Sequence, residues 1–514
     1  MEFAHVKSGN VSRGHRFLCK EPVVISDPLS YKETMREAFV IVDQDERREM
    51  IRTGLLAVAD KLGGHVWHNA DLLEEINYLV EYPTPLYGRI DDEFLKLPVP
   101  AVVTPMRDHQ RYYPVRNEDG SLMPYFLTVR NGGTKALENV QHGNEKVLRA
   151  RLDDAKFFFE NDRKKTLEGH RDDLTRINYQ EGMGDMRDKA DRLQKLTEAI
   201  GKDWDFTAEE AADADRAAFL SKSDLATGMV TEFTELQGEM GKEYALLDGE
   251  KTEVAQAIFE QYMPRFAGDI LPQQEIGRAL SLADKLDNLA ATFLRGLIPT
   301  GSQDPFALRR QTIGAVNILT DGKIHWDIRR GIEAALALLP GDEETKKTVL
   351  SQIEDFFRQR IKAIMLDEGI AYDIIDAVLA GPVDDIYALF LKARSMAESQ
   401  LKGEAELRQA VTRLANITKG KTGGKVDPSL FTEDVEKKLQ DAFEAVSAKA
   451  LPLFASYEYG KALPALKDLT APINDYLDNV MVMVDDEAVK NNRISQLLAT
   501  LALFNTWGDF SKLV

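Results

Sequence analysis

The residues best suited to chemistry are cations gathered in one stretch, from Lys392 to Lys425. Eight Lys or Arg residues against three Glu give this stretch a local charge of +5 in a chain of net charge −20. Cations that neutralise phosphates release counterions, which favours binding of a nucleic acid backbone. The candidate binding residues are Arg394, Arg413, Asn416, Lys419, Lys421 and Lys425. The stretch therefore predicts a phosphate-binding surface, and the alternative is a solvated helix face followed by a flexible loop.

A second group of candidates lies on predicted helices between about 160 and 330. Two segments, LSKSDLATGMV and LSLADKLDNLA, each place an Asp beside an apolar helical stripe. The arrangement resembles the HD superfamily of metal-dependent phosphohydrolases, whose members bind metal through an early His, a His-Asp doublet and a later Asp. Aligned on that pattern, Lys189 and Ser223 stand at the His positions, and only Asp224 and Asp284 remain. Because a transition metal needs several converging donors, we expect a helical scaffold without a metal site.

A third candidate is the segment GLIPTGSQDPFALRRQTIG. Asp304 followed by Pro305 predicts the start of a helix, with the Asp as N-cap and the proline at the first helical position. This helix would carry Arg309 and Arg310 on its second turn. The two arginines could contact a phosphate or a partner chain, or they could be solvated or salt-bridged surface residues, and the sequence leaves both open.

Common catalytic signatures are absent from the sequence, including the GxxxxGK and GxGxxG phosphate loops, HExxH and the cysteine spacings of metal sites. A single cysteine, Cys19, cannot form an internal disulfide, and no signal-like start or long uncharged apolar run is present. The balance of 65 Lys+Arg against 85 Asp+Glu argues against attraction of the whole surface to nucleic acid or anionic lipid. We therefore expect a cytoplasmic protein without membrane or DNA partners.

The elements that must position these residues are mostly helices. The 514 residues are 44% hydrophobic and 29% charged, as in globular proteins of several domains. Residues 1–160 mix short alternating segments with turn signals, and Asp119-Gly120 predicts a hairpin. From about Asn144 the periodicity becomes helical. Breaks with Gly or Pro occur at 299–305, 339–344, 380–385 and 419–429. We predict a mainly α, multidomain protein with an α+β N-terminal region and seams near 160, 330 and 385.

Seven segments, read in order, point to a family. They are RGHRF, HQRYYPV, GNEKVLRARLDDAKFFFENDRKK, YMPRFAGDILP, LADKLDNL, GLIPTGSQDPFALRR and VMVMVDDEAVKNNRISQLL. Over nearly the whole chain they resemble the β subunit of bacterial glycyl-tRNA synthetase. The family's chain is longer at its N-terminus, and the opening MEFAHVKSGNVSRGHRF lacks a recognisable first element. We therefore expect a version that is shortened at its N-terminus.

The resemblance implies four domains. They are an incomplete α+β region at 1–160, a degenerate HD-like helical domain at 161–330, a helical connector at 331–384 and a helical anticodon-binding domain at 385–514. In the family two α and two β chains assemble, the α chain holds the class II catalytic site, and the β chain recognises tRNA(Gly). The resemblance thus implies a glycine–tRNA ligase subunit without catalytic residues, metal or cofactor of its own. ATP and Mg are used by the α partner.

Within the implied anticodon-binding domain, the resemblance strengthens the interpretation of the basic stretch. Arg413, Asn416 and Lys419 stand where related domains start a helix pair against the tRNA. In the closing segment Arg493 is either a tRNA contact or part of a surface ion pair. The predicted core residues of that segment are Val480, Val482 and Leu497.

Two other functions compete with this one. The first is a metal-dependent nucleotide phosphohydrolase that uses the HD-like helices, and Lys189 and Ser223 argue against it. The second is a free-standing tRNA-binding protein derived from the subunit, which a shortened N-terminus makes conceivable. Co-purification with an α chain would separate the second case from a synthetase subunit.

Overall fold

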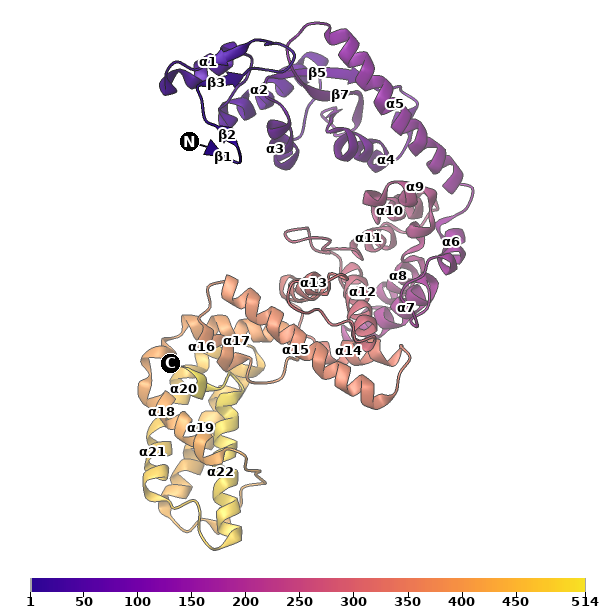
Figure 1. Ribbon diagram of the computed structural model, residues 1–514. Coiled ribbons are helices and arrows are strands. Elements are labelled where there is room, and N and C mark those ends of the chain that lie inside the picture. Colours follow the sequence, from indigo (N-terminus) through magenta and orange to yellow (C-terminus); the bar gives the residue numbers. More distant parts are fainter. Residues whose placement is uncertain (1, 514) are drawn as a thin grey trace. The chain divides into compact units, whose positions relative to one another are not determined.

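The computed structural model of the protein describes residues 2–513 (Figure 1). The chain divides into two compact units. Unit 1 comprises Met1–Ile177 and Lys222–Ala255, and unit 2 comprises Asn178–Ser221 and Gln256–Val514. Within the described residues, all strands lie before Gly132 and helices make up most of the rest. The predicted fold class, mainly α with an α+β N-terminal region, is confirmed. Residues of the predicted HD-like region, 161–330, contribute to both units, and the bounds of the four domains stay a prediction.

Unit 1 contains a three-stranded antiparallel sheet of order β5-β7-β6. Its strands are β5 (Pro83–Arg89), β6 (Tyr113–Arg116) and β7 (Leu122–Asn131). Strands β6 and β7 form the hairpin predicted at Asp119-Gly120. Gly120 has φ +84°, a left-handed conformation that glycine adopts without strain. The hairpin prediction is therefore confirmed.

Two helices pack on this sheet and build its core. Helix α2 (Gln44–Leu62) is capped by the Asp43 carboxylate, and α3 (Ala70–Leu79) by the Asn69 side chain. Each cap satisfies amides of the first turn that have no partner within the helix. Apolar residues of both helices meet those of the sheet in one buried cluster. Its members are Ile51, Leu55, Ala59, Leu72, Leu73, Ile76, Val80, Tyr113, Val115 and Leu127.

The long helix α5 (Leu137–Asp162) connects the sheet to the remaining helices of unit 1. Its last residue, Asp162, is buried and accepts hydrogen bonds from the amides of Gly228 and Met229 and from the Tyr244 hydroxyl. These bonds tie α5 to α9 (Gly228–Glu232) and α10 (Glu239–Leu247). The other elements are β1 (Glu2–Phe3), β2 (Val6–Lys7), β3 (Val11–Arg13), β4 (Pro22–Val24), α1 (Tyr31–Glu37), α4 (Val99–Thr104) and α6 (Leu167–His170). Helix α11 (Thr252–Glu260) crosses the boundary between the units.

The centre of the first half of unit 2 is helix α12 (Glu275–Leu294). It packs against α7 (Met186–Asp203), α8 (Ala208–Leu220), α13 (Leu308–Asp321), α14 (Ile328–Ala337) and α15 (Glu343–Asp367). Because neighbours surround it, almost every residue of α12 is buried. Its charged residues must therefore find partners inside the protein.

The prediction that α13 begins at Pro305 is wrong by three residues, since the helix begins at Leu308. Ala307, the residue before it, has φ +52°, so the chain turns before the helix starts. The Asp304 carboxylate still accepts hydrogen bonds from the amides of Leu308 and Arg309. It therefore caps the helix across a turn, and the two arginines of the segment lie on the first turn rather than the second. The Arg309 guanidinium donates to the carbonyl of Gly301.

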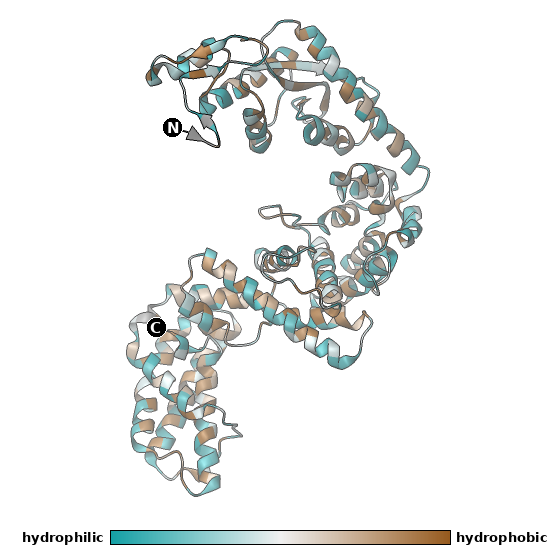
Figure 2. Cartoon of the chain, viewed as in Figure 1, coloured by the Kyte–Doolittle hydropathy of each residue, from teal (hydrophilic) through white to brown (hydrophobic). Residues whose placement is uncertain are grey.

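The C-terminal part of unit 2 is a helical bundle. Its elements are α16 (Tyr372–Val378), α17 (Ile386–Glu398), α18 (Ala405–Thr418), α19 (Asp434–Ala455), α20 (Leu463–Lys467), α21 (Thr470–Asn479) and α22 (Glu487–Asn505). Helices α18, α19, α21 and α22 pack against one another and mix hydrophobic and hydrophilic residues along their lengths (Figure 2). Val480, Val482 and Leu497 are buried, as predicted. Within residues 2–513 no helix is long and apolar enough to cross a membrane.

Candidate nucleic-acid interface

Helix α18 presents the first candidate residues. Its apolar side, with Leu407, Val411 and Leu414, is buried in the bundle. Arg413 and Asn416 lie on the opposite, exposed side. The helix ends after Thr418, where Lys419 leaves the helical conformation and Gly420 takes φ +70°. The sequence thus places a polar face and then a loop at the same end of α18.

The loop after α18, residues 419–427 (the lysine loop), is fixed on helix α22. The Gly424 amide donates to the Ser495 hydroxyl at 2.8 Å, and the Asp427 amide donates to the Asn492 side chain at 2.7 Å. The Asn492 amide group in turn donates to the Asp427 carbonyl at 3.0 Å. A Cβ on Gly423 would lie 3.0 Å from Leu498, so a glycine allows this close approach. The lysine loop is therefore held on α22 by hydrogen bonds at Gly424 and at Asp427.

Two of the predicted contacts are arginines that already have carboxylate partners. The Arg394 guanidinium donates to both Glu368 oxygens, at 3.0 and 2.8 Å. Arg413 donates to Asp478 of α21 at 2.5 Å and to Asn474 at 2.9 Å. These pairs are exposed, so each arginine could exchange its carboxylate for a phosphate, but the carboxylates reduce the local positive charge.

The other predicted contact residues make fewer interactions with neighbouring side chains. Lys419, Lys425 and Asn416 are exposed. Lys421 is half-buried, and its ammonium lies 3.1 Å from the Met483 sulfur. Within the described residues, none of the three lysines has a carboxylate within ion-pair distance. They are the cations of the predicted stretch that are most available to a phosphate.

Sequence reasoning missed two exposed methionines, of which Met483 contacts Lys421 of the lysine loop. Residues 480–483 alternate, with Val480 and Val482 buried and Met481 and Met483 exposed to 73% and 56%. The alternation lies in the connection between α21 and α22, which bends at residues 482 and 483, and the letters VMVMV carried the signal. Exposed thioethers are polarizable and pack well on aromatic rings. The lysines and methionines together offer charge for phosphates and an apolar surface for bases.

Arg493 requires a correction, because it is neither a surface ion pair nor a group that a tRNA could reach. Its side chain is 5% exposed, and its partner Glu436 of α19 is fully buried. The guanidinium donates to both Glu436 oxygens, to the Met481 carbonyl and to the Thr432 hydroxyl. With donors on all three nitrogens engaged, Arg493 joins α22 to α19 and fixes the chain at Met481.

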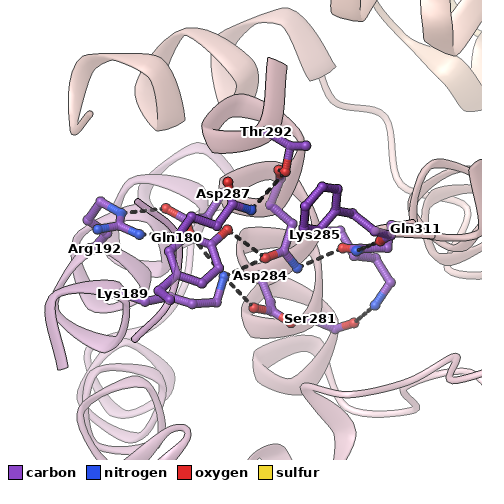
Figure 3. Close-up of polar contacts among 12 residues, drawn as sticks. Gln180, Lys189, Arg192, Ser281, Asp284, Lys285, Asp287, Thr292 and Gln311 are labelled. Atoms are coloured by element: carbon purple, nitrogen blue, oxygen red, sulfur yellow. Dashed lines mark hydrogen bonds and ion pairs between the residues drawn. The ribbon is translucent and has the colours of Figure 1, made fainter. Parts of the chain in front are cut away.

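Two of the four HD-like positions, Lys189 and Asp284, belong to an ion network inside unit 2 (Figure 3). The Lys189 ammonium of α7 lies 2.9 Å from Asp284 and 2.9 Å from Asp287 of α12, and it donates to Asn288 at 2.8 Å. Arg192 donates to Asp287 at 2.6 Å. Burial would lower the pKa of Lys189, but the two carboxylates outweigh it and raise that pKa above its usual value. An ammonium thus balances the carboxylates that the helices bring together.

Neighbouring groups complete this network. Burial raises the pKa of the Tyr179 phenol to about 12, and its hydroxyl donates to Asn288. Burial acts to raise the pKa of Asp287, whereas Lys189 and Arg192 bring it below its ordinary value.

Asp224 lies in unit 1 and accepts a hydrogen bond from the Gly238 amide before α10. Among the described residues no three His, Cys, Asp or Glu side chains gather in a way that could hold a metal ion.

Comparison with known proteins identifies the family. Residues 1–380 match the family described as glycyl-tRNA synthetase beta subunit, and residues 407–508 match the DALR anticodon binding domain. The chain belongs to the glycyl-tRNA synthetase beta subunit family. It is 45% identical over 508 residues to the glycine–tRNA ligase beta subunit of Clostridioides difficile and 40% identical over 512 residues to that of Bacillus subtilis. Each alignment covers 99% of this chain and 74% of the relative.

Membership in the glycyl-tRNA synthetase beta subunit family confirms the resemblance found in the sequence. The lysine loop, Arg413, Asn416 and the two exposed methionines all lie inside the residues that match the DALR domain. Arg394 lies between the two matched regions. The match therefore groups the available cations with the domain whose description names the anticodon.

Proposed function

We propose that this chain is the tRNA-recognising subunit of a glycine–tRNA ligase and that it holds tRNA(Gly) while an α partner attaches glycine. The observation that carries the proposal is the lysine loop, which is fixed on α22 and presents three lysines without carboxylate partners within the described residues. In a chain of net charge −20 such a surface favours a polyanion. Its place within the DALR match favours the anticodon arm as the polyanion.

The proposal includes a partner and a compartment. The relatives are named beta subunits, and the name implies an α counterpart. We propose an assembly of two α and two β chains in the cytoplasm. In it the α chain uses ATP and Mg, and this chain contributes no cofactor. The ion network of Lys189 supports this division of labour, because its carboxylates serve an internal ammonium.

Neutralising the lysine loop is expected to weaken tRNA binding. The variant Lys419→Gln/Lys421→Gln/Lys425→Gln should bind tRNA about tenfold to a hundredfold more weakly at 0.1 M salt. The slope of log affinity against log salt is negative, and its magnitude should decrease by about two to three units, since each lost phosphate contact removes roughly 0.7–0.9. Fluorescence anisotropy with labelled tRNA(Gly) at several salt concentrations measures both quantities.

The matched control for this variant replaces lysines of similar exposure elsewhere in the bundle. Lys437 and Lys438 of α19 are exposed, and their replacement by Gln removes two positive charges, against three in the lysine-loop variant. The control should leave affinity and salt slope close to those of the parent. If the lysine-loop variant bound tRNA like the parent, the loop would not be the contact, and the proposal would lose its main support.

Asn416 is expected to affect selectivity more than affinity. Its amide group can donate and accept, and it makes no hydrogen bond to another side chain within the described residues. Unpaired bases of a tRNA loop are read through such hydrogen bonds. Asn416→Ala should reduce the preference for tRNA(Gly) over an unrelated tRNA by about fivefold to tenfold, which is the scale of one net hydrogen bond. Equal losses for both tRNAs would contradict a base-reading role.

A further inference from the structure

Unit 1 contains a surface that the lysine loop does not explain. Two adjoining pockets of about 310 and 350 Å³ share Trp67, His68, Asn69 and Tyr113. The remaining lining of the two includes three arginines and no acidic residue, within a chain that has 20 more acidic than basic groups. This surface (the Trp67 surface) therefore combines aromatic and apolar side chains with positive charge.

Trp67 is the most prominent side chain of this surface. The residue is 63% exposed, although a tryptophan is among the side chains that gain most from burial. It lies beside the β6–β7 hairpin, where a Cβ on Gly120 would lie 3.8 Å from the indole. Leu55, Leu73 and Tyr113, which line the same surface, belong to the sheet core and give it a rigid base. An exposed indole on a rigid base is a platform for stacking another planar group.

Arg116 supplies the cation next to this platform. Its guanidinium carbon lies 4.5 Å from the centroid of the Trp67 ring, and it donates to the Gly120 carbonyl at 2.7 Å. The residue is half-buried, and within the described residues no carboxylate pairs with it. Arg52 and Arg107 of the same lining differ, because Glu49 and Asp108 pair with them. Arg116 is thus the guanidinium of this surface that lacks an anionic partner.

We propose that the Trp67 surface binds an unpaired nucleotide of RNA, with the base stacked on Trp67 and the phosphate held by Arg116. This inference rests on the proposed function and adds a second RNA contact, in unit 1. Charge complementarity favours RNA, because the lining contains no acidic residue and Arg116 has no carboxylate partner within the described residues, so an anionic group would find an available guanidinium there. Recognition of unpaired nucleotides by an aromatic ring beside a guanidinium is the expected chemistry.

The test uses the full chain and a single-stranded hexaadenylate RNA, with an RNA duplex of equal length for comparison. Trp326 and Trp507 are buried and Trp204 is half-buried, so Trp67 is the most accessible indole of the four. Hexaadenylate should quench tryptophan fluorescence in the parent, and Trp67→Phe should abolish the quenching. Trp67→Ala should weaken binding about fivefold to a hundredfold, the scale of one stacked base, and Arg116→Ala should weaken it severalfold.

The control for these variants is Tyr78→Ala, which removes another aromatic residue of unit 1 that is also 63% exposed but lies outside the two pockets. It should bind hexaadenylate like the parent. Hexaadenylate bound equally by parent and Trp67→Ala, or quenching that survives Trp67→Phe, would overturn the proposal. So would a Trp67→Ala variant that keeps hexaadenylate binding and loses the α chain, because the surface would then be a protein interface.

The two RNA contacts can fail separately. Quenching of Trp67 reports only on its own surroundings, so the lysine-loop variant should keep it even where tRNA binding is weakened. If hexaadenylate did not quench the parent's tryptophan fluorescence while the parent still bound tRNA through the lysine loop, the inference would be overturned and the proposed function would remain. If the chain bound hexaadenylate at Trp67 but bound no tRNA, the proposed function would be overturned and the nucleotide site at Trp67 would remain.

Discussion

Replacing Lys189 by methionine is expected to lower the free energy of unfolding by about 3–5 kcal/mol. The side chain is 3% exposed, and its ammonium lies 2.9 Å from both Asp284 and Asp287. Methionine has nearly the same length but no charge, so the variant removes the ammonium that the two buried carboxylates share, although Asp287 keeps Arg192. Urea unfolding followed by circular dichroism measures the loss.

The sign of the pH dependence follows from the two shifts. The pKa of Lys189 is raised in the folded protein, so its contribution is complete at neutral pH and is lost only as the pH rises through the folded-state value. The pKa of Asp287 is lowered, so its contribution is lost as the pH falls through its folded-state value. The difference between parent and variant should therefore be largest near neutral pH. Lys195→Met on the exposed side of α7 is the control, and a Lys189→Met loss as small as this control's would contradict the buried network.

Arg493→Met is expected to cost a similar amount, about 3–5 kcal/mol, because it leaves the fully buried Glu436 without its cation. Burial acts to raise the pKa of Glu436, but hydrogen bonds from Arg493 and from the amides of Glu433 and Thr432 hold that pKa below its ordinary value. The stability that ionised Glu436 contributes is present at neutral pH and is lost as the pH falls through the pKa of Glu436 in the folded protein. Thermal unfolding of parent and variant between pH 3 and pH 7 would show the two converging at low pH.

A second measurement separates this structural role from a tRNA contact. Held well below its unfolding temperature, Arg493→Met should bind tRNA with the affinity and salt slope of the parent. Lys490→Met on the same helix removes an ion pair with exposed Glu487 and should change stability by less than about 1 kcal/mol. A salt slope lowered by about one unit in Arg493→Met would instead assign it a phosphate contact.

Local signals in the sequence predicted local structure well. Asp119-Gly120 supplies the left-handed residue that a tight turn needs, so the hairpin between β6 and β7 could be read directly. Val480, Val482 and Leu497 were predicted as core residues from the resemblance of the closing segment to the family, and all three are buried. The start of α13 was not, because Asp304 reaches amides four and five residues ahead across a turn that a residue pattern does not specify.

The ion pairs of the charged side chains could not be predicted, because the two partners of each pair are distant in the sequence. Arg413 pairs with Asp478, and Arg493 with Glu436, at separations of 65 and 57 residues. Counting charges between 392 and 425 therefore overstated the cations available to RNA. The lysines at 419, 421 and 425 kept their availability because they follow the end of α18, where a loop rather than a packed face carries them.

The ammonium of Lys189 has a further consequence for the cell. A domain stabilised by a bound metal ion owes part of its stability to the free concentration of that ion, through mass action. Here the counter-ion of Asp284 and Asp287 is covalently part of the chain. Because this ammonium belongs to the chain, the stability that it contributes to the core around α12 does not depend on the free concentration of any ion.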